Sequence, residues 1–209
     1  MSVTRVILAR HGQTELNRLQ IVQGSGVDPG LNDVGLRQAT LLYERFRGQI
    51  AQVVSSGLVR SDETVAPFVA DGVPHRVDPR LREICWGVHE GKVATDVSRE
   101  QYAELMASWT SGDLDARLEG GESAREMADR LRAAWNELTV SNYGTVLACL
   151  HGRALRCLAA IVDEAPVAQM QHYAHSNAGY YVAVKAADGN WQLRERNVTT
   201  HLKEPKPAA

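Results

Sequence analysis

The chain has 209 residues, of which 44% are hydrophobic and 23% charged, and its formal net charge at pH 7 is −2. These values fit one globular domain with a substantial core, and they give no general attraction for nucleic acid or for an anionic membrane surface. No apolar run approaches the length of a membrane span and no signal peptide is evident, so we expect a cytoplasmic protein.

Two apolar runs end on the same pair of residues. Residues 6–12 read Val-Ile-Leu-Ala-Arg-His-Gly, and residues 146–152 read Val-Leu-Ala-Cys-Leu-His-Gly. A short continuous apolar run is typical of a strand buried on both faces of a parallel sheet, and such strands present ligand-binding residues at their carboxyl ends. We therefore expect His11 and His151 at one rim of the sheet, where with Arg10 they would form a receptor for a phosphoryl group.

Helices and strands alternate between these two runs. A short helical turn is expected at 13–17, and the glycine-rich loop at 23–30 does not fit the dinucleotide fingerprint G-x-G-x-x-G. Asn32 is a suitable N-cap for an amphipathic helix that extends to about residue 47. A strand at 52–56, a helix at 58–69 and a short strand at 73–77 are predicted to follow.

From residue 87 to residue 121 the pattern weakens, apart from one helix at about 96–109 with Met106 and Trp109 in its core. A stretch of this length between core elements is usually a lid or binding loop, so we interpret 87–121 as a lid or insertion. Ser123 and Glu126 fit a capping box that opens a strongly amphipathic helix.

The remaining elements predict a strand at 145–150, a helix at 153–162 and a closing pair of strands at 180–185 and 191–195. Asp188-Gly189 between the closing strands indicates a hairpin turn. Because no repeat or linker interrupts the pattern, residues 1–209 are expected to form a single domain, with a flexible tail at 203–209. The alternation of strands and helices predicts the α/β class.

Five blocks in the sequence, taken in order, resemble the histidine phosphatase superfamily, the phosphoglycerate-mutase-like proteins. An isolated Arg-His-Gly would be weak evidence, whereas ordered blocks over residues 5 to 200 are specific. The matching positions are Arg10-His11-Gly12-Gln13-Thr14 with Asn17; Gln23-Gly24 with Asp28-Pro29; Ser55-Ser56 with Leu58, Arg60 and Thr64; Leu81, Glu83, Gly87 and Glu90-Gly91; and Gly120-Gly121-Glu122-Ser123 followed by His151-Gly152.

The resemblance implies a three-layer α/β/α sandwich with a mostly parallel central sheet and a lid over the site. It also implies transient phosphorylation of the first histidine, with no metal and no cofactor. Members of this family are often dimers, so a homodimer is one assembly it allows. By position, the catalytic set would be His11, Glu83, His151, Arg10 and Arg60, with Glu83 as proton donor and with phosphate-binding support from Asn17, Gln23 and Gly152.

The chemistry of these residue types leads to the same roles. A phosphomonoester dianion needs about two compensating charges, which Arg10 and Arg60 carry permanently. A protonated His151 would add a third for the charge that spreads over the equatorial oxygens in the transition state. His11 must be neutral at one nitrogen to attack phosphorus, and Glu83 would protonate the leaving alkoxide and then activate water.

The sequence also bears on three alternative functions. Phosphoglycerate mutases carry a longer insertion rich in arginine, tyrosine and proline, whereas residues 92–119 are shorter and show no such cluster, which favours a phosphatase acting on a small phosphorylated metabolite. A non-catalytic phosphate-binding module is the rival from another class. The spacing from Cys149 to Arg153 does not fit a tyrosine-phosphatase loop, and the three cysteines, with Cys85 and Cys157, are expected to be reduced thiols outside any metal site.

Some residues keep two interpretations. Trp86 and His89 either line the substrate pocket or only pack nearby, and Arg153 either reaches a substrate carboxylate or second phosphate or faces solvent. The remaining histidines are expected at the surface or in packing positions: His75, His172, His175 and His201.

Overall fold

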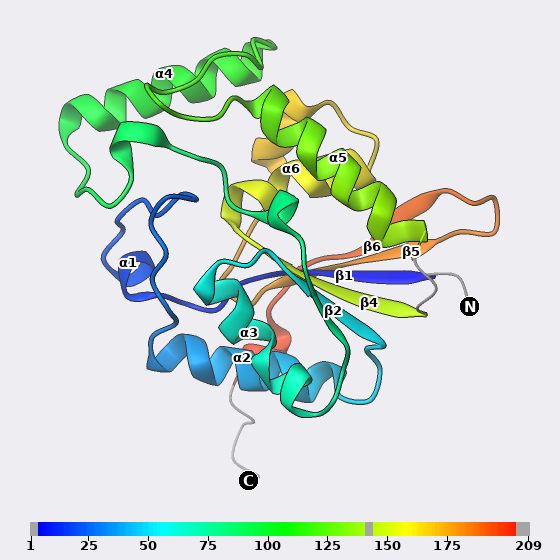
Figure 1. Cartoon of the computed structure of the whole chain (residues 1–209). Coiled ribbons are helices and arrows are strands. Elements are labelled where there is room, and N and C mark those ends of the chain that lie inside the picture. Colours follow the sequence, from blue (N-terminus) through cyan, green and yellow to red (C-terminus); the bar gives the residue numbers. More distant parts are fainter. Residues whose placement is uncertain (1–3, 141–143, 204–209) are drawn as a thin grey trace, which may run out of the picture.

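The computed structural model describes residues 4–140 and 144–203, and the expected tail at 203–209 lies almost wholly outside them. Within these residues a six-stranded sheet has the order β3-β2-β4-β1-β5-β6 (Figure 1). The four strands from β3 to β1 are parallel, and both β5 and β6 run antiparallel to their inner neighbours. The sheet is therefore mixed, with a parallel core and an antiparallel edge. Its strands are β1 (Arg5–Arg10), β2 (Gln52–Ser55), β3 (His75–Val77), β4 (Thr145–Leu150), β5 (Tyr180–Lys185) and β6 (Trp191–Val198).

The central strands are buried on both faces, as their apolar runs predicted. In β1, Val6 and Leu8 belong to one hydrophobic cluster while Ile7 and Ala9 belong to the other. Helices α5 (Ala124–Val140) and α6 (Gly152–Val162) contribute to the first cluster, and α2 (Asp33–Phe46) and α3 (Val59–Ala70) contribute to the second. Figure 1 shows these two pairs of helices on opposite sides of the sheet, which confirms the three-layer α/β/α class.

The expected helix starts are present. Asn32 caps α2 by accepting a hydrogen bond from the Gly35 N–H at 2.9 Å. Ser123 and Glu126 form the capping box before α5, each binding the backbone N–H of the other. These side chains satisfy donors that would otherwise be unpaired in the first helical turn.

The segment after β3 leaves the sheet and returns at α5. It contains α4 (Asp96–Ser111), which Figure 1 shows apart from the sheet on the side of α5 and α6. Trp109 is fully buried and Met106 packs against the core, so α4 is anchored by one face. The short helices are α1 (Glu15–Arg18), η1 (Pro79–Leu81), η2 (Gly87–His89), η3 (Val167–His172) and η4 (Thr200–Leu202).

The predicted elements differ from the observed ones mainly at their ends. The strand expected from residue 73 begins at His75, α4 continues to Ser111, and β6 extends to Val198 rather than residue 195. The short helices η1, η2, η3 and η4 were not predicted, because three to six residues carry too little periodicity to distinguish a helical turn from a loop.

Candidate active site

His11 and His151 meet at the carboxyl ends of neighbouring parallel strands. Arg10 of β1 stands opposite Leu150 of β4, so the next residue of each strand is a histidine, and the His11 N–H donates to the Leu150 carbonyl at 3.0 Å. The two imidazole ring centroids are 5.1 Å apart and both side chains are buried. The structure therefore brings the two histidines together as the sequence predicted.

His11 is held in one tautomer. Its Nδ1 lies 2.7 Å from the Gly12 carbonyl oxygen, which can only accept, so Nδ1 carries the proton and Nε2 holds a lone pair. Burial, followed by the charges of Arg10 and Arg60, lowers the pKa of His11 well below its usual value. A neutral imidazole with a basic Nε2 has the form that a nucleophile toward phosphorus requires.

His151 is neutral in this structure, which differs from the expected cation. Its Nδ1 accepts a hydrogen bond from Arg60 Nε at 3.2 Å, so Nε2 carries the proton and donates to Ser56 Oγ at 2.7 Å. Burial and the positive charge of Arg60 lower the pKa of His151 well below its usual value. The third positive charge predicted for this position is absent from the arrangement seen here.

Arg60 enters the site from the first turn of α3 and is only 1% exposed. Its guanidinium also donates to the Gly24 carbonyl at 2.7 Å and to the Val27 carbonyl at 3.1 Å, and it lies 3.4 Å from the Asp28 carboxylate. Arg60 thus borders the cavity and at the same time holds the glycine-rich loop in place.

Arg10 and Gln23 carry polar atoms suited to an oxyanion or its surroundings. Both residues line the cavity, and among the described residues Arg10 Nε and Gln23 Oε1 are buried without a hydrogen-bond partner. Burial lowers the pKa of Arg10 to about 10, which still leaves the guanidinium charged at neutral pH. Buried polar groups normally have partners, so these two atoms indicate a binding position for a polar ligand.

Asn17 lies at the cavity wall through the turn that begins α1. Its Oδ1 accepts from the Thr14 N–H at 3.2 Å and from Asn177 Nδ2 at 3.0 Å. Asn177 also donates to the carbonyls of His11 and Gly12, each at 3.2 Å. The position predicted for Asn17 is thus fixed by the segment before β5, which the sequence did not assign to the site.

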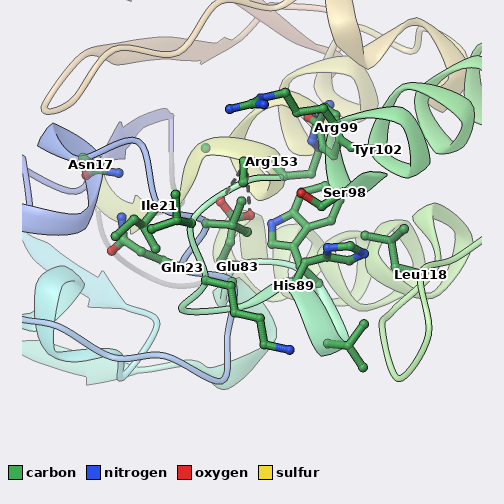
Figure 2. Close-up of a pocket in the computed structure, with 18 of the residues that line it drawn as sticks. Asn17, Ile21, Gln23, Glu83, His89, Ser98, Arg99, Tyr102, Leu118 and Arg153 are labelled. Atoms are coloured by element: carbon green, nitrogen blue, oxygen red, sulfur yellow. Dashed lines mark hydrogen bonds between the residues drawn. The ribbon is translucent and has the colours of Figure 1, made fainter. Parts of the chain in front are cut away.

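Glu83 follows η1 in the chain, and its carboxylate lies in the cavity wall at the N-terminal end of α6. Its carboxylate accepts from the backbone N–H of Arg153 at 3.0 Å (Figure 2). It also accepts from the backbone N–H groups of Ala154 and Ile84, each at 3.0 Å. Gly152 also lines the cavity, where a Cβ atom would lie 3.5 Å from Glu83 Oε2, an ordinary contact, and 3.3 Å from Cε1 of His175, a tight one. The predicted proton donor is therefore held rigidly next to the phosphate-binding residues.

The cavity has a volume of about 560 Å³ and extends beyond the phosphate-binding end. Trp86 and His89 both belong to its wall, and Arg153 also lines it and is buried rather than exposed to solvent. The segment 92–119 also brings Lys92, Arg99 and Tyr102 to the wall, although its sequence showed no basic cluster. Figure 2 shows Tyr102 beside Arg153, whose guanidinium donates to the Tyr102 hydroxyl.

His175 was expected at the surface or in packing, and this prediction is wrong. The residue is half-buried and lines the cavity, and its Nδ1 lies 3.1 Å from Arg10 NH1. Burial and the neighbouring arginines lower the pKa of His175 to about 3. The missed signal was topological, because a strand antiparallel to β1 begins at the rim where β1 ends.

The described residues contain no group of three His, Cys, Asp or Glu side chains placed to hold a metal ion. All three cysteines are free, and burial raises the pKa of the Cys149 and Cys157 thiols to about 12. In the part of the chain that the structure describes, no helix is both long enough and apolar enough to cross a bilayer.

Comparison with known proteins gives one consistent result. The family model described as histidine phosphatase superfamily (branch 1) matches residues 6–199. A probable phosphoglycerate mutase, GpmB, of Yersinia pestis is 33% identical over 96% of each chain. Among solved structures, a mycobacterial glucosyl-3-phosphoglycerate phosphatase is 28% identical over 94% of this chain and all of its own, with a TM-score of 0.81. A phosphoserine phosphatase of Entamoeba histolytica, at 23% identity over 96% of this chain and all of its own, has the same fold with a TM-score of 0.82.

Proposed function

The chain belongs to the histidine phosphatase superfamily, and from this premise we propose that it hydrolyses phosphomonoesters through a phosphohistidine formed on His11. The observation that carries the proposal is the neutral His11, whose Nδ1 is bound to the Gly12 carbonyl and whose Nε2 keeps its lone pair among the cationic groups of the site. A nucleophile surrounded by arginines is suited to attack on a phosphoryl dianion.

In the first step the Nε2 lone pair of His11 forms a bond to phosphorus and the bond from phosphorus to the ester oxygen breaks. Glu83, in its protonated form, donates a proton to the departing oxygen. In the second step the Glu83 carboxylate accepts a proton from water, the water oxygen bonds to phosphorus, and the phosphorus–nitrogen bond breaks. Inorganic phosphate leaves and both side chains return to their starting forms.

The covalent intermediate and the arginines together supply more of the acceleration than Glu83 does. Hydrolysis of a phosphomonoester can require acceleration of up to about 10²¹-fold, whereas a general acid contributes about 10²- to 10⁴-fold. The remainder must come from the covalent intermediate and from charge stabilisation by Arg10 and Arg60. His151 can donate a hydrogen bond to a phosphoryl oxygen through Nδ1 only after that nitrogen gains a proton, because in this structure Nδ1 accepts from Arg60 Nε and the Nε2 proton is given to Ser56.

A mutase is the second candidate, favoured by the name of the Yersinia relative. In a mutase the phosphoryl group on histidine passes to a second phosphoglycerate, whereas in a phosphatase it passes to water. The short segment 92–119 and the 28% identity to a phosphatase of the same fold support water as the acceptor.

The proposal is tested with p-nitrophenyl phosphate in the presence of EDTA. We expect sustained release of p-nitrophenol by the wild type and no turnover above background by His11→Ala. Quenching during turnover should trap phosphate on His11 that is stable in alkali and labile in acid. Phosphate trapped on a serine or cysteine, or binding without turnover, would overturn the mechanism.

The same trapped species separates the two candidates. When it is chased with 3-phosphoglycerate, a phosphatase releases inorganic phosphate at the same rate as in buffer alone. A mutase instead transfers the label to the added acceptor, and that result would replace the phosphatase assignment.

A further inference from the structure

Arg153 is a buried cation in the wall of the cavity. It lies in the first turn of α6 and is 7% exposed. Its guanidinium donates to Gln171 Oε1 at 2.7 Å and to the Tyr102 hydroxyl, and its central carbon lies 5.6 Å from the centre of the Trp86 ring. These contacts fix the guanidinium against an aromatic surface, with neutral groups as its hydrogen-bond partners.

No carboxylate of the described residues forms an ion pair with this guanidinium. Arg130, which is less deeply buried, illustrates the usual arrangement, because its Nε lies 2.6 Å from the Glu122 carboxylate. Arg153 has a second cation nearby instead, since its charge contributes to lowering the pKa of Arg156. Burying a charge without an opposite charge is costly, so this position would be stabilised by an anionic ligand.

The guanidinium has capacity for that ligand. Two of its five N–H groups are used by Gln171 and Tyr102, which leaves three donors in a planar fork. The Tyr102 hydroxyl accepts from Arg153, so its own proton is free to bind an anion as well. Trp86 and Tyr102, whose ring centroids are 5.5 Å apart, form an adjoining aromatic wall of the same cavity.

We propose that Arg153, with Tyr102, binds a second anionic group of the substrate, a carboxylate or a second phosphate, and so selects phosphomonoesters that carry one. This inference rests on the proposed function. Glu83 and Arg153 line the same cavity, and the backbone N–H of Arg153 binds the Glu83 carboxylate. The leaving group of a substrate whose ester oxygen meets Glu83 would therefore occupy the cavity that the guanidinium also borders.

The test compares three aryl phosphates that differ in one substituent: phenyl phosphate, 4-carboxyphenyl phosphate and 1,4-phenylene bisphosphate. We expect Arg153→Gln to lower kcat/KM for the carboxylated compound or for the bisphosphate by about tenfold to a hundredfold, the usual effect of losing a charge-assisted hydrogen-bond pair. Phenyl phosphate should change by less than about threefold, because it lacks the second anion. The compound with the larger loss of kcat/KM, carboxylated or bisphosphate, identifies which second anion Arg153 binds.

Two variants control for a purely structural role. Arg153→Lys keeps the charge and should restore part of the preference, while Arg132→Gln removes an exposed arginine on α5 that is paired with Asp129 and should leave all three rates unchanged. If Arg153→Gln lowers the rates for all three compounds equally, Arg153 supports the fold and the inference is wrong.

Binding to His11→Ala, measured by calorimetry, separates this inference from the proposed function. Tighter binding of a charged compound than of phenyl phosphate, lost in the His11→Ala/Arg153→Gln double variant, supports the second-anion site even if the wild type hydrolyses none of the compounds. Equal affinities for all three compounds would overturn the site while leaving the phosphatase proposal intact.

Discussion

Glu83 illustrates how much a single side chain depends on its backbone neighbours. Its carboxylate binds two N–H groups at the start of α6 and a third from Ile84. A helix N-terminus carries partial positive charge and unpaired donors, so it anchors a carboxylate in one place. Backbone N–H groups thus provide the hydrogen bonds that hold this carboxylate at the cavity, where it also interacts electrostatically with Arg10 and Arg60.

Glu83→Gln should affect substrates according to their leaving groups. The amide keeps the size of the side chain but cannot donate a proton in the same way, so the loss should reach about 10²- to 10⁴-fold for an alkyl phosphate. p-Nitrophenyl phosphate should lose much less, because p-nitrophenolate departs without protonation. Steady-state kcat for the two substrates makes the comparison, and equal losses would refute the acid role.

The loop after β1 is positioned by close backbone contact with α2. A Cβ atom at Gly12 would lie 2.6 Å from the Gly35 carbonyl oxygen, and one at Gly35 would overlap the backbone of Gln13. The Gly12 N–H also donates to Thr64 Oγ1 of α3 at 3.0 Å. Two helices on the same face of the sheet thus fix the carbonyl that sets the tautomer of His11.

Gly35→Ala is expected to destabilise the protein although alanine is the better helix former. Helix propensity favours alanine by about 1 kcal/mol. The overlap with Gln13 opposes it with the cost of overpacking, about 1 to 3 kcal/mol. Since the neighbouring atoms are backbone, we expect a net loss of stability and reduced phosphatase activity.

Urea unfolding and kcat of the same sample measure both effects of Gly35→Ala. Gly144→Ala is the matched control, because nothing lies within 4 Å of a Cβ at that position. A Gly35→Ala protein as stable and as active as the control would show that the contact between the loop and α2 is not constraining.

At the scale of the whole molecule, folding keeps three histidines of the site in their neutral form. Burial, with the neighbouring arginines, lowers the pKa of His11, His151 and His175. In the unfolded chain each histidine titrates near about 6.5. Below that pH the unfolded state binds more protons than the folded state, so the free energy of unfolding must fall as the solution becomes more acidic.

We therefore expect stability to be constant with respect to these histidines above about pH 7 and to fall between pH 6.5 and pH 5, by up to about 1.4 kcal/mol per pH unit for each histidine. His175→Gln should remove one histidine's share of that slope in urea unfolding. His172→Gln, at an exposed position, is the control. Identical slopes for wild type and His175→Gln would contradict the argument.

The comparison of sequence and structure separates local from non-local information. The apolar runs before His11 and His151 predicted two buried strands correctly, and the parallel pairing of β1 with β4 placed both histidines at one rim. The caps at Asn32 and Ser123 were equally readable, since a cap depends on residues three positions apart. What was missed at the site, His175 and Asn177, precedes an antiparallel strand whose partner lies far away in the sequence.

The sequence by itself determined the α/β class, the family and the set of histidines, arginines and glutamate gathered at the site, because apolar runs, caps and ordered motifs are local signals. Only the tertiary structure decided that His151 is neutral, that His175 contacts Arg10 and that Arg153 is buried beside Trp86 without an ion-pair partner among the described residues. Protonation and burial depend on which groups lie nearby in space, and those neighbours are brought together by sheet pairing and helix packing.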